Sequence, residues 1–154
     1  MNIHPSRVVA GVLLVASGFV VAVSALAIAL AKILVDAGMT VRPADAALLG
    51  DLVSLLPFIV TFAGMNFVAA VGLLAAKPWA EAIAASTVAV AVTIGAIGLL
   101  LVIAGRDPLA SGVAAKATAD GIGILGAFTL HYLAVIAALG ITRLPQRVSA
   151  AAVS

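Results

Sequence analysis

The chain has 154 residues, of which 65% are hydrophobic and 9% charged, with a formal net charge of +2. A soluble domain carries about 25% charged residues, so eight Lys and Arg with six Asp and Glu cannot cover a water-exposed surface. This composition excludes a soluble globular domain, and the thin spread of basic residues excludes a nucleic-acid-binding protein. Without cysteine, the chain can form no disulfide and no thiolate metal site.

Four stretches free of charged residues predict an all-α integral membrane protein. They are Val8–Ala31, Leu52–Ala76, Ala82–Gly105 and Gly121–Thr142, each 22–25 residues long. As helices they reach about 33–37 Å, enough to cross a hydrocarbon core of about 30 Å. A β-barrel would need shorter segments of alternating polarity. We therefore expect a single transmembrane domain over 1–154, an up-down bundle of four transmembrane helices at about 8–32, 52–76, 79–105 and 120–142.

The first span follows Arg7 and contains Ala25-Leu26-Ala27, a small-x-small pattern typical of signal peptidase sites. The apolar stretch continues to Val35, which favours an uncleaved anchor. Gly18 and Ala22 lie four residues apart and predict a helix-packing face, because small residues let helix backbones approach closely in lipid. Beyond this span, Pro43 starts a predicted short surface helix over about 43–50. Its apolar side would consist of Leu48, Leu49 and Leu52.

The second span contains two unusual residues. Pro57 either kinks the helix or marks its true start, with 52–56 then belonging to the preceding loop. Asn66 lies near the middle of the span, where an unpaired amide would cost several kcal/mol. An interhelical hydrogen bond to His131 or Thr93 would remove most of that cost, and we expect Asn66 and His131 to face each other.

The connection to the third span reads AAKPWAEA over residues 75–82. Pro78 disfavours helix at Lys77 and suits the first turn of the next helix. Trp79 prefers the headgroup level, and Glu81 would lie in a helix first turn, where the helix dipole favours an anion. The residues predict a tight interfacial turn; a lipid-headgroup or partner-docking turn is the alternative.

Small residues predict contact faces on the last two spans as well. The third span offers Ala85, Ala89 and Thr93, and the fourth offers Gly123 and Ala127. Asp120 is the expected N-cap of the fourth helix. Residues 121–126, GIGILG, match the dinucleotide-binding pattern G-x-G-x-x-G. They follow a polar loop rather than a strand and open a membrane helix, so we expect no nucleotide to bind.

His131 falls at the centre of the fourth span. Ionisable residues near the bilayer midplane are costly and often functional. One interpretation is a neutral histidine that bonds to a neighbouring helix. The functional alternatives are a proton-relay group, a haem ligand or a quinone contact. The only other histidine is His4, near the membrane surface, so a haem held by two histidines would need a second subunit.

The spans contain no Asp, Glu, Lys or Arg in their charge-free cores, and the chain has no catalytic motif. We therefore expect no enzyme, no catalytic residues, no metal and no cofactor of its own. The leading hypothesis is an accessory or scaffold subunit of a larger membrane complex of transporter or respiratory type, with other membrane subunits or further copies of the chain as partners. One alternative is a small transporter or permeation pathway that uses His131 and Asn66 at the midplane, where Thr93 would complete a polar binding cluster. The other is a membrane-embedded redox or enzymatic subunit that lends His131 to a cofactor shared with a partner.

Orientation rests on a small difference in charge density. Arg7, Lys77, Arg143 and Arg147 lie on one side, and Lys32, Arg42, Arg106 and Lys116 on the other. The first set stands in shorter segments, so the positive-inside rule favours both termini in the cytoplasm. Composition rich in Ala, Val and Gly suggests a bacterial chain, and hence a multi-pass protein of the bacterial inner membrane.

Overall fold

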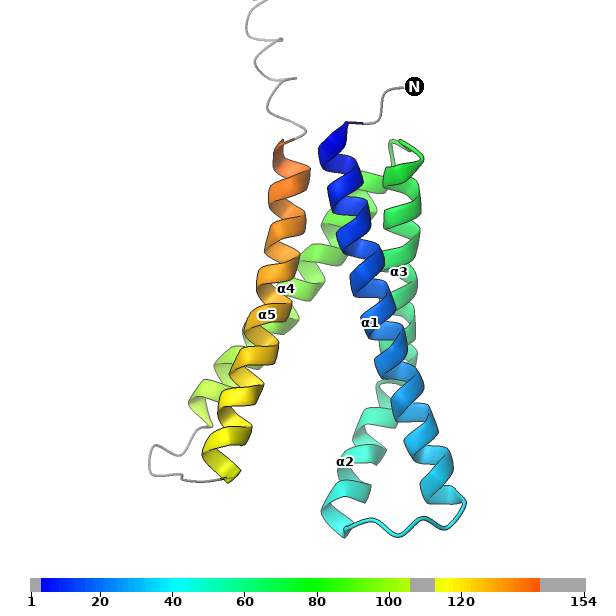
Figure 1. Cartoon of the computed structure of the whole chain (residues 1–154), viewed down its shortest axis with the longest axis vertical. Helices are drawn as coiled ribbons and strands as arrows, with labels where there is room; N and C mark the ends of the chain where they lie inside the picture. Colours follow the sequence, from blue (N-terminus) through cyan, green and yellow to red (C-terminus); the bar gives the residue numbers. More distant parts are fainter. Residues whose placement is uncertain (1–3, 106–112, 142–154) are drawn as a thin grey trace, which may run out of the picture.

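The computed structural model describes residues 4–105 and 113–141, and every regular element in these ranges is helical. The helices are α1 (Pro5–Asp36), α2 (Pro43–Ser54), α3 (Leu56–Leu74), α4 (Ala80–Ala104) and α5 (Val113–Ile141) (Figure 1). By length and composition α1, α3, α4 and α5 can each cross a membrane. The predicted all-α fold with four spans is confirmed, and the protein is a multi-pass membrane protein.

Local sequence sets the start of α1. His4 is the N-cap, and its imidazole accepts a hydrogen bond from the Ser6 backbone N–H at 3.4 Å. Pro5 follows in the first turn, where its missing N–H costs nothing. The helix therefore begins before the predicted span does, and it continues to Asp36.

The helical structure is interrupted at Leu55, between α2 and α3. Pro57 stands in the first turn of α3, where its fixed φ suits a helix start. It marks the start of the second span rather than a kink. Residues 52–54 belong to α2, which extends beyond the predicted 43–50. Leu48, Leu49 and Leu52 face the end of α1 across a groove of about 310 Å³ that Leu34 and Val35 also line.

The turn between α3 and α4 closes α3 with a Schellman motif. The Lys77 N–H donates to Gly72 O at 2.9 Å, and the Ala76 N–H donates to Leu73 O at 3.1 Å. Ala76 has φ of 53°, a left-handed conformation that glycine usually supplies. Trp79 folds over Gly72, whose absent Cβ would lie 2.7 Å from the indole ring. The hairpin predicted at Lys77, Pro78 and Trp79 is therefore a packed turn.

Helix α5 begins at Val113, so the prediction that Asp120 caps it is wrong. The first residues of α5, VAAKATAD, stand before the apolar run. They are rich in Ala, whose high helix propensity lets the helix start outside that run. Residues 106–112 of the predicted loop, and Thr142 with Arg143 and Arg147, lie outside the described residues.

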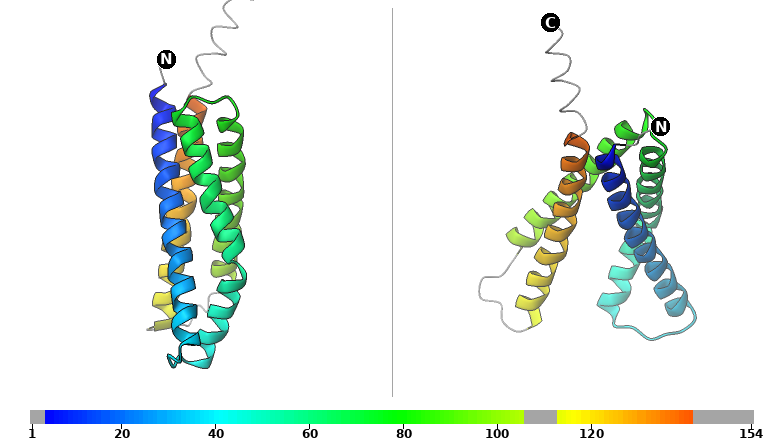
Figure 2. Two further views of the ribbon diagram at one scale, coloured as in Figure 1. Left: turned by 90° about the vertical axis from the view of Figure 1, so that its right-hand side faces the viewer. Right: turned by 45° about the horizontal axis from the view of Figure 1, so that its top comes forward.

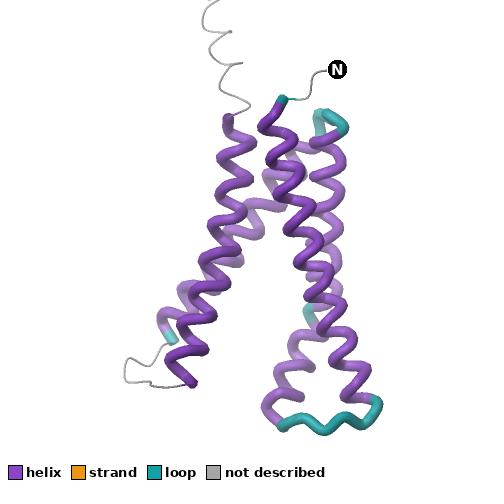
Figure 3. The backbone as a smooth tube through the Cα atoms, in the orientation of Figure 1, coloured by secondary structure: helices purple, strands orange, loops and turns teal. Residues whose placement is uncertain are grey.

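The four spanning helices pack as two pairs, α1 with α3 and α4 with α5. The pairs converge at the end that holds Pro5, the α3–α4 turn and Ile141, and they diverge toward the other end (Figures 1 and 2). Arg7 and Glu81 form an ion pair of 2.5 Å at the converging end. Helix α2 contacts α1 and α3 at the diverging end, and within the described residues it does not pack against α4 or α5 (Figure 3).

Small residues bring the helices together. A Cβ on Gly18 would lie 3.3 Å from that of Asn66, so Gly18 lets α1 approach α3. Gly95 lets α4 approach α5, because its Cβ would lie 2.3 Å from Thr129 Oγ1. The buried ridge of α4 consists of Ala80, Ala84, Thr87, Val88, Ala91 and Gly95.

Candidate functional site

Four polar side chains lie near the middle of the bundle, on three helices. They are Ser17 on α1, Asn66 on α3, and His131 and Tyr132 on α5. Successive residues of a helix point about 100° apart. This angle directs His131 toward α1 and Tyr132 toward α3, so α5 supplies one polar side chain to each of these two helices.

Ser17 is the partner of His131. The Ser17 hydroxyl donates to Leu13 O of the preceding turn at 2.9 Å. His131 Nε2 lies 2.6 Å from Ser17 Oγ and 3.1 Å from Leu13 O. The imidazole thus contacts a serine hydroxyl and a backbone carbonyl of α1. Ser17 itself is buried.

Asn66 is bonded to Tyr132 and not to His131. The Tyr132 hydroxyl donates to Asn66 Oδ1 at 3.0 Å, and Asn66 Nδ2 donates to Phe62 O at 2.8 Å. Both side chains are fully buried. The expected Asn66–His131 contact is therefore corrected to two neighbouring pairs, because Tyr132 is long enough to reach across to α3 and Ser17 occupies the imidazole.

Aromatic rings surround the two pairs. Tyr132 lies 5.0 Å from the Phe128 ring and 6.0 Å from the Phe62 ring, in tilted geometry. His131 meets Tyr132 edge to face at 5.5 Å. Each such contact stabilises the fold by about 0.5–1.5 kcal/mol beyond the burial of apolar area. The contacts also hold both polar side chains of α5 in place.

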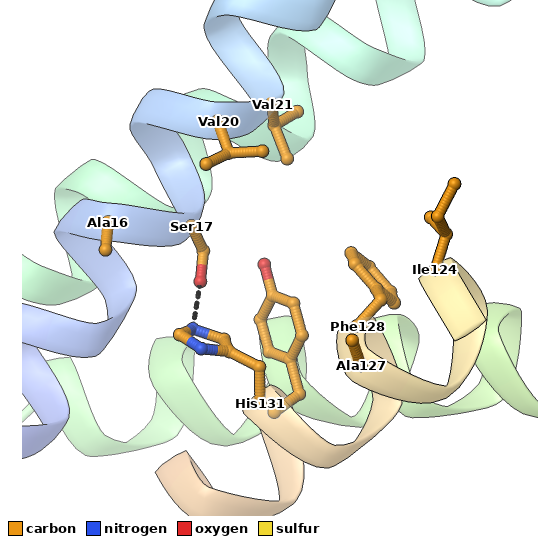
Figure 4. Close-up of a pocket in the computed structure, with 9 residues that line it drawn as sticks. Ala16, Ser17, Val20, Val21, Ile124, Ala127, Phe128 and His131 are labelled. Atoms are coloured by element: carbon orange, nitrogen blue, oxygen red, sulfur yellow. Dashed lines mark hydrogen bonds between the residues drawn. The ribbon is translucent and has the colours of Figure 1, made fainter. Parts of the chain in front are cut away.

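A pocket of about 470 Å³ opens between α1 and α5 beside these residues. Ser17, His131 and Tyr132 are its polar residues. The apolar lining consists of Ala16, Val20, Val21, Ile124, Ala127 and Phe128 (Figure 4). Ser17 and His131 meet at one end, and Val20, Val21 and Ile124 lie toward the diverging end of the helix pairs.

The remaining residues predicted as sites lie apart from this pocket, except Ala127. Thr93 is exposed and donates to Ala89 O at 2.8 Å, so it does not join the midplane cluster. Gly123, Ala85 and Ala89 are also exposed, whereas Ala22 is half-buried beside α3. Lys77, Pro78 and Trp79 form the exposed turn at the converging end.

Sequence reasoning missed Ser17 and Tyr132. Tyr132 is the only tyrosine of the chain, and it stands in the centre of a span rather than at the interface that tyrosine prefers. That position is itself a signal of a buried hydrogen bond. Ser17 carried no comparable signal, because serine readily satisfies its hydroxyl on the preceding helical turn.

The site offers hydrogen-bonding side chains from three helices. Within the described residues, no group of three His, Asp or Glu side chains lies close enough to hold a metal ion. His4 caps the start of α1, 13 residues before Ser17, which is about 20 Å along the helix. The two histidines of one chain are therefore too far apart to bind the same haem iron.

No protein-family model, no curated protein and no solved structure matches this chain.

Proposed function

We propose that the protein is a non-catalytic accessory or scaffold subunit of a larger membrane complex, of transporter or respiratory type. The observation that supports this role is the position of its small residues. Ala85 and Ala89 on α4 and Gly123 on α5, which the sequence marks as helix-packing residues, lie on exposed faces. The helices of this chain pack against one another through other residues.

Such faces suit another transmembrane helix better than lipid. Helices associate in lipid through close backbone approach, which small residues permit. A Cβ on Gly64, Gly123 or Gly126 would meet nothing within 4 Å, so each position has room for a neighbouring backbone. Ala85 and Ala89 also border a groove of about 300 Å³ between α4 and α5.

Purification from native membranes in mild detergent, followed by native gel electrophoresis and mass spectrometry, tests this role. We expect the chain to migrate with larger partners in fixed stoichiometry. The variant Ala89→Leu should release it, because added bulk keeps a partner helix away. The matched control is Val90→Phe, since Val90 is an exposed neighbour that points to another side of α4. A chain that runs alone in the unmodified form contradicts the proposal.

We further propose that the protein resides in the bacterial inner membrane with both termini in the cytoplasm. Support comes from the shorter basic segments on the side of Arg7 and Lys77. Arg7 lies in the first turn of α1 and Lys77 in the α3–α4 turn. These two segments share one end of the bundle (Figure 1), so one side of the membrane would hold both residues.

A small transporter is the second candidate. The observation that favours it is the polar residues Ser17, His131, Tyr132 and Asn66, which extend across the bundle from α1 to α3. Reconstitution into liposomes with candidate substrates, compared with His131→Ala, tests it. Transport lost in a folded His131→Ala variant supports this candidate, and transport that persists contradicts a role for His131.

A further inference from the structure

The pocket between α1 and α5 has the dimensions of a ligand site. Its volume of about 470 Å³ lies within the range of about 300–1,000 Å³ typical of small-molecule sites. Most of the lining is apolar, with an aromatic ring from Phe128 and polar groups from Ser17, His131 and Tyr132. An apolar molecule with one polar group matches this lining.

The hydrogens of the polar lining residues are already donated. The Ser17 hydroxyl donates to Leu13 O, and the Tyr132 hydroxyl donates to Asn66 Oδ1. The Leu13 carbonyl oxygen can only accept, so its approach to His131 Nε2 at 3.1 Å favours a hydrogen on Nε2. The Ser17 oxygen, 2.6 Å from Nε2, then accepts from the imidazole while its own hydrogen is donated to Leu13 O.

This assignment leaves His131 Nδ1 as an acceptor. A charged imidazole is costly inside a membrane, and a neutral one protonated at Nε2 has an unprotonated Nδ1. Within residues 4–105 and 113–141, Nδ1 has no hydrogen-bond partner. Among the side-chain nitrogen and oxygen atoms of the described pocket lining, Nδ1 is the only one without any hydrogen-bond partner. His131 is half-buried.

We propose that this pocket binds a lipid-soluble hydroxyl compound, of the phenol, quinol or long-chain alcohol class, and that His131 Nδ1 accepts the hydrogen bond of its hydroxyl. A carbonyl or ether oxygen at the same place would set one acceptor against another. The apolar part of the ligand lies along Val20, Val21 and Ile124.

Such a ligand can arrive through the bilayer. Val20 and Ile124 are 63% and 70% exposed, so the pocket is bordered by side chains that face lipid. The pocket extends from Ser17 and His131 toward the end where α1 and α5 diverge (Figures 1 and 4). Lateral entry needs no charged or water-filled path, and the site does not depend on the proposed subunit role.

A matched pair of probes tests the inference in lipid nanodiscs. The first probe is 4-nonylphenol, and the second is its methyl ether, which keeps the apolar body but lacks the donor. Histidine labelled with ¹⁵N, in a His4→Gln background, reports on His131 alone. We expect the phenol to shift the Nδ1 resonance saturably and to bind about three- to tenfold more tightly than the ether, the value of one net hydrogen bond.

Two variants locate the effect. Ala127→Phe fills the pocket and should abolish the phenol-induced shift, whereas Ala134→Phe, exposed two turns further along α5 and outside the pocket lining, should leave it unchanged. If either variant fails to fold, the two probes on the unmodified pocket still decide. Equal affinity for phenol and ether, or no Nδ1 shift at saturating phenol, overturns the proposal.

Discussion

At the scale of single residues, the polar interior consists of two hydrogen-bonded pairs, Ser17 with His131 and Asn66 with Tyr132. Interhelical hydrogen bonds in membranes are worth about 0.6–2 kcal/mol net. We expect double-mutant cycles of Ser17→Ala with His131→Leu, and of Asn66→Leu with Tyr132→Phe, each to show coupling of that size. Unfolding by SDS in mixed micelles measures the free energies.

The crossed pair serves as the control for these cycles. Asn66 and His131 share no hydrogen bond and are linked only indirectly through Tyr132, so Asn66→Leu combined with His131→Leu should show weaker coupling than either bonded pair. Stronger coupling in the crossed pair than in the bonded pairs would contradict the hydrogen-bond assignment.

At the scale of helices, the contact between α4 and α5 depends on Gly95. A Cβ there would lie 2.3 Å from Thr129 Oγ1, which itself donates to Leu125 O at 2.8 Å. Overpacking of this kind costs about 1–3 kcal/mol. We therefore expect Gly95→Ala to lower the free energy of unfolding by about that amount, measured by SDS unfolding.

Two comparisons make the Gly95 prediction specific. Thr129→Ala removes the clashing oxygen and should restore most of the stability that Gly95→Ala loses. Gly123→Ala should cost nothing, because its Cβ would meet no atom within 4 Å. Similar losses from Gly95→Ala and Gly123→Ala would contradict an effect specific to the α4–α5 contact, because helix propensity alone favours Ala over Gly at both positions.

At the scale of the whole molecule, the termini of the described chain and the α3–α4 turn share one end of the bundle (Figure 1). The chain has no cysteine, so a single introduced thiol labels cleanly. We expect Thr40→Cys to react with an impermeant maleimide in intact cells, and Lys77→Cys to react only after permeabilisation, if Lys77 lies in the cytoplasm as we propose from the positive-inside rule. If Lys77→Cys reacts in intact cells and Thr40→Cys does not, the orientation is the opposite of the one we propose.

The sequence predicts the helices well and their contacts less well. Charge-free runs of membrane length determine where spans occur, because lipid excludes every other single-segment solution. Gly18 was predicted to pack and does so, facing Asn66. On α4 the bundle buries Ala84, Val88 and Gly95 rather than Ala85 and Ala89, because a span rich in small residues offers several equivalent faces.

The candidate site was predictable in part for the same reason. His131 and Asn66 stand out as polar residues inside apolar runs, and both are bonded in the bundle interior. Their partners depend on the rotation of each helix about its axis, which hydrophobic periodicity cannot fix when all faces are apolar. The pairing of Ser17 with His131 and of Tyr132 with Asn66 therefore follows from the helix rotations in the structure and not from the sequence.

The divergence of the two helix pairs connects the protein to the thickness of its membrane. Helix α1 has 32 residues and α3 has 19, lengths of about 48 and 29 Å beside a hydrocarbon core of about 30 Å. Long helices meet such a mismatch by tilting, and they tilt further as the bilayer thins. Because the pocket lies between α1 and α5, we expect its width to follow that tilt. A thinner bilayer would then widen the pocket and a thicker one would narrow it, so that lipid chain length would control how easily a molecule reaches His131.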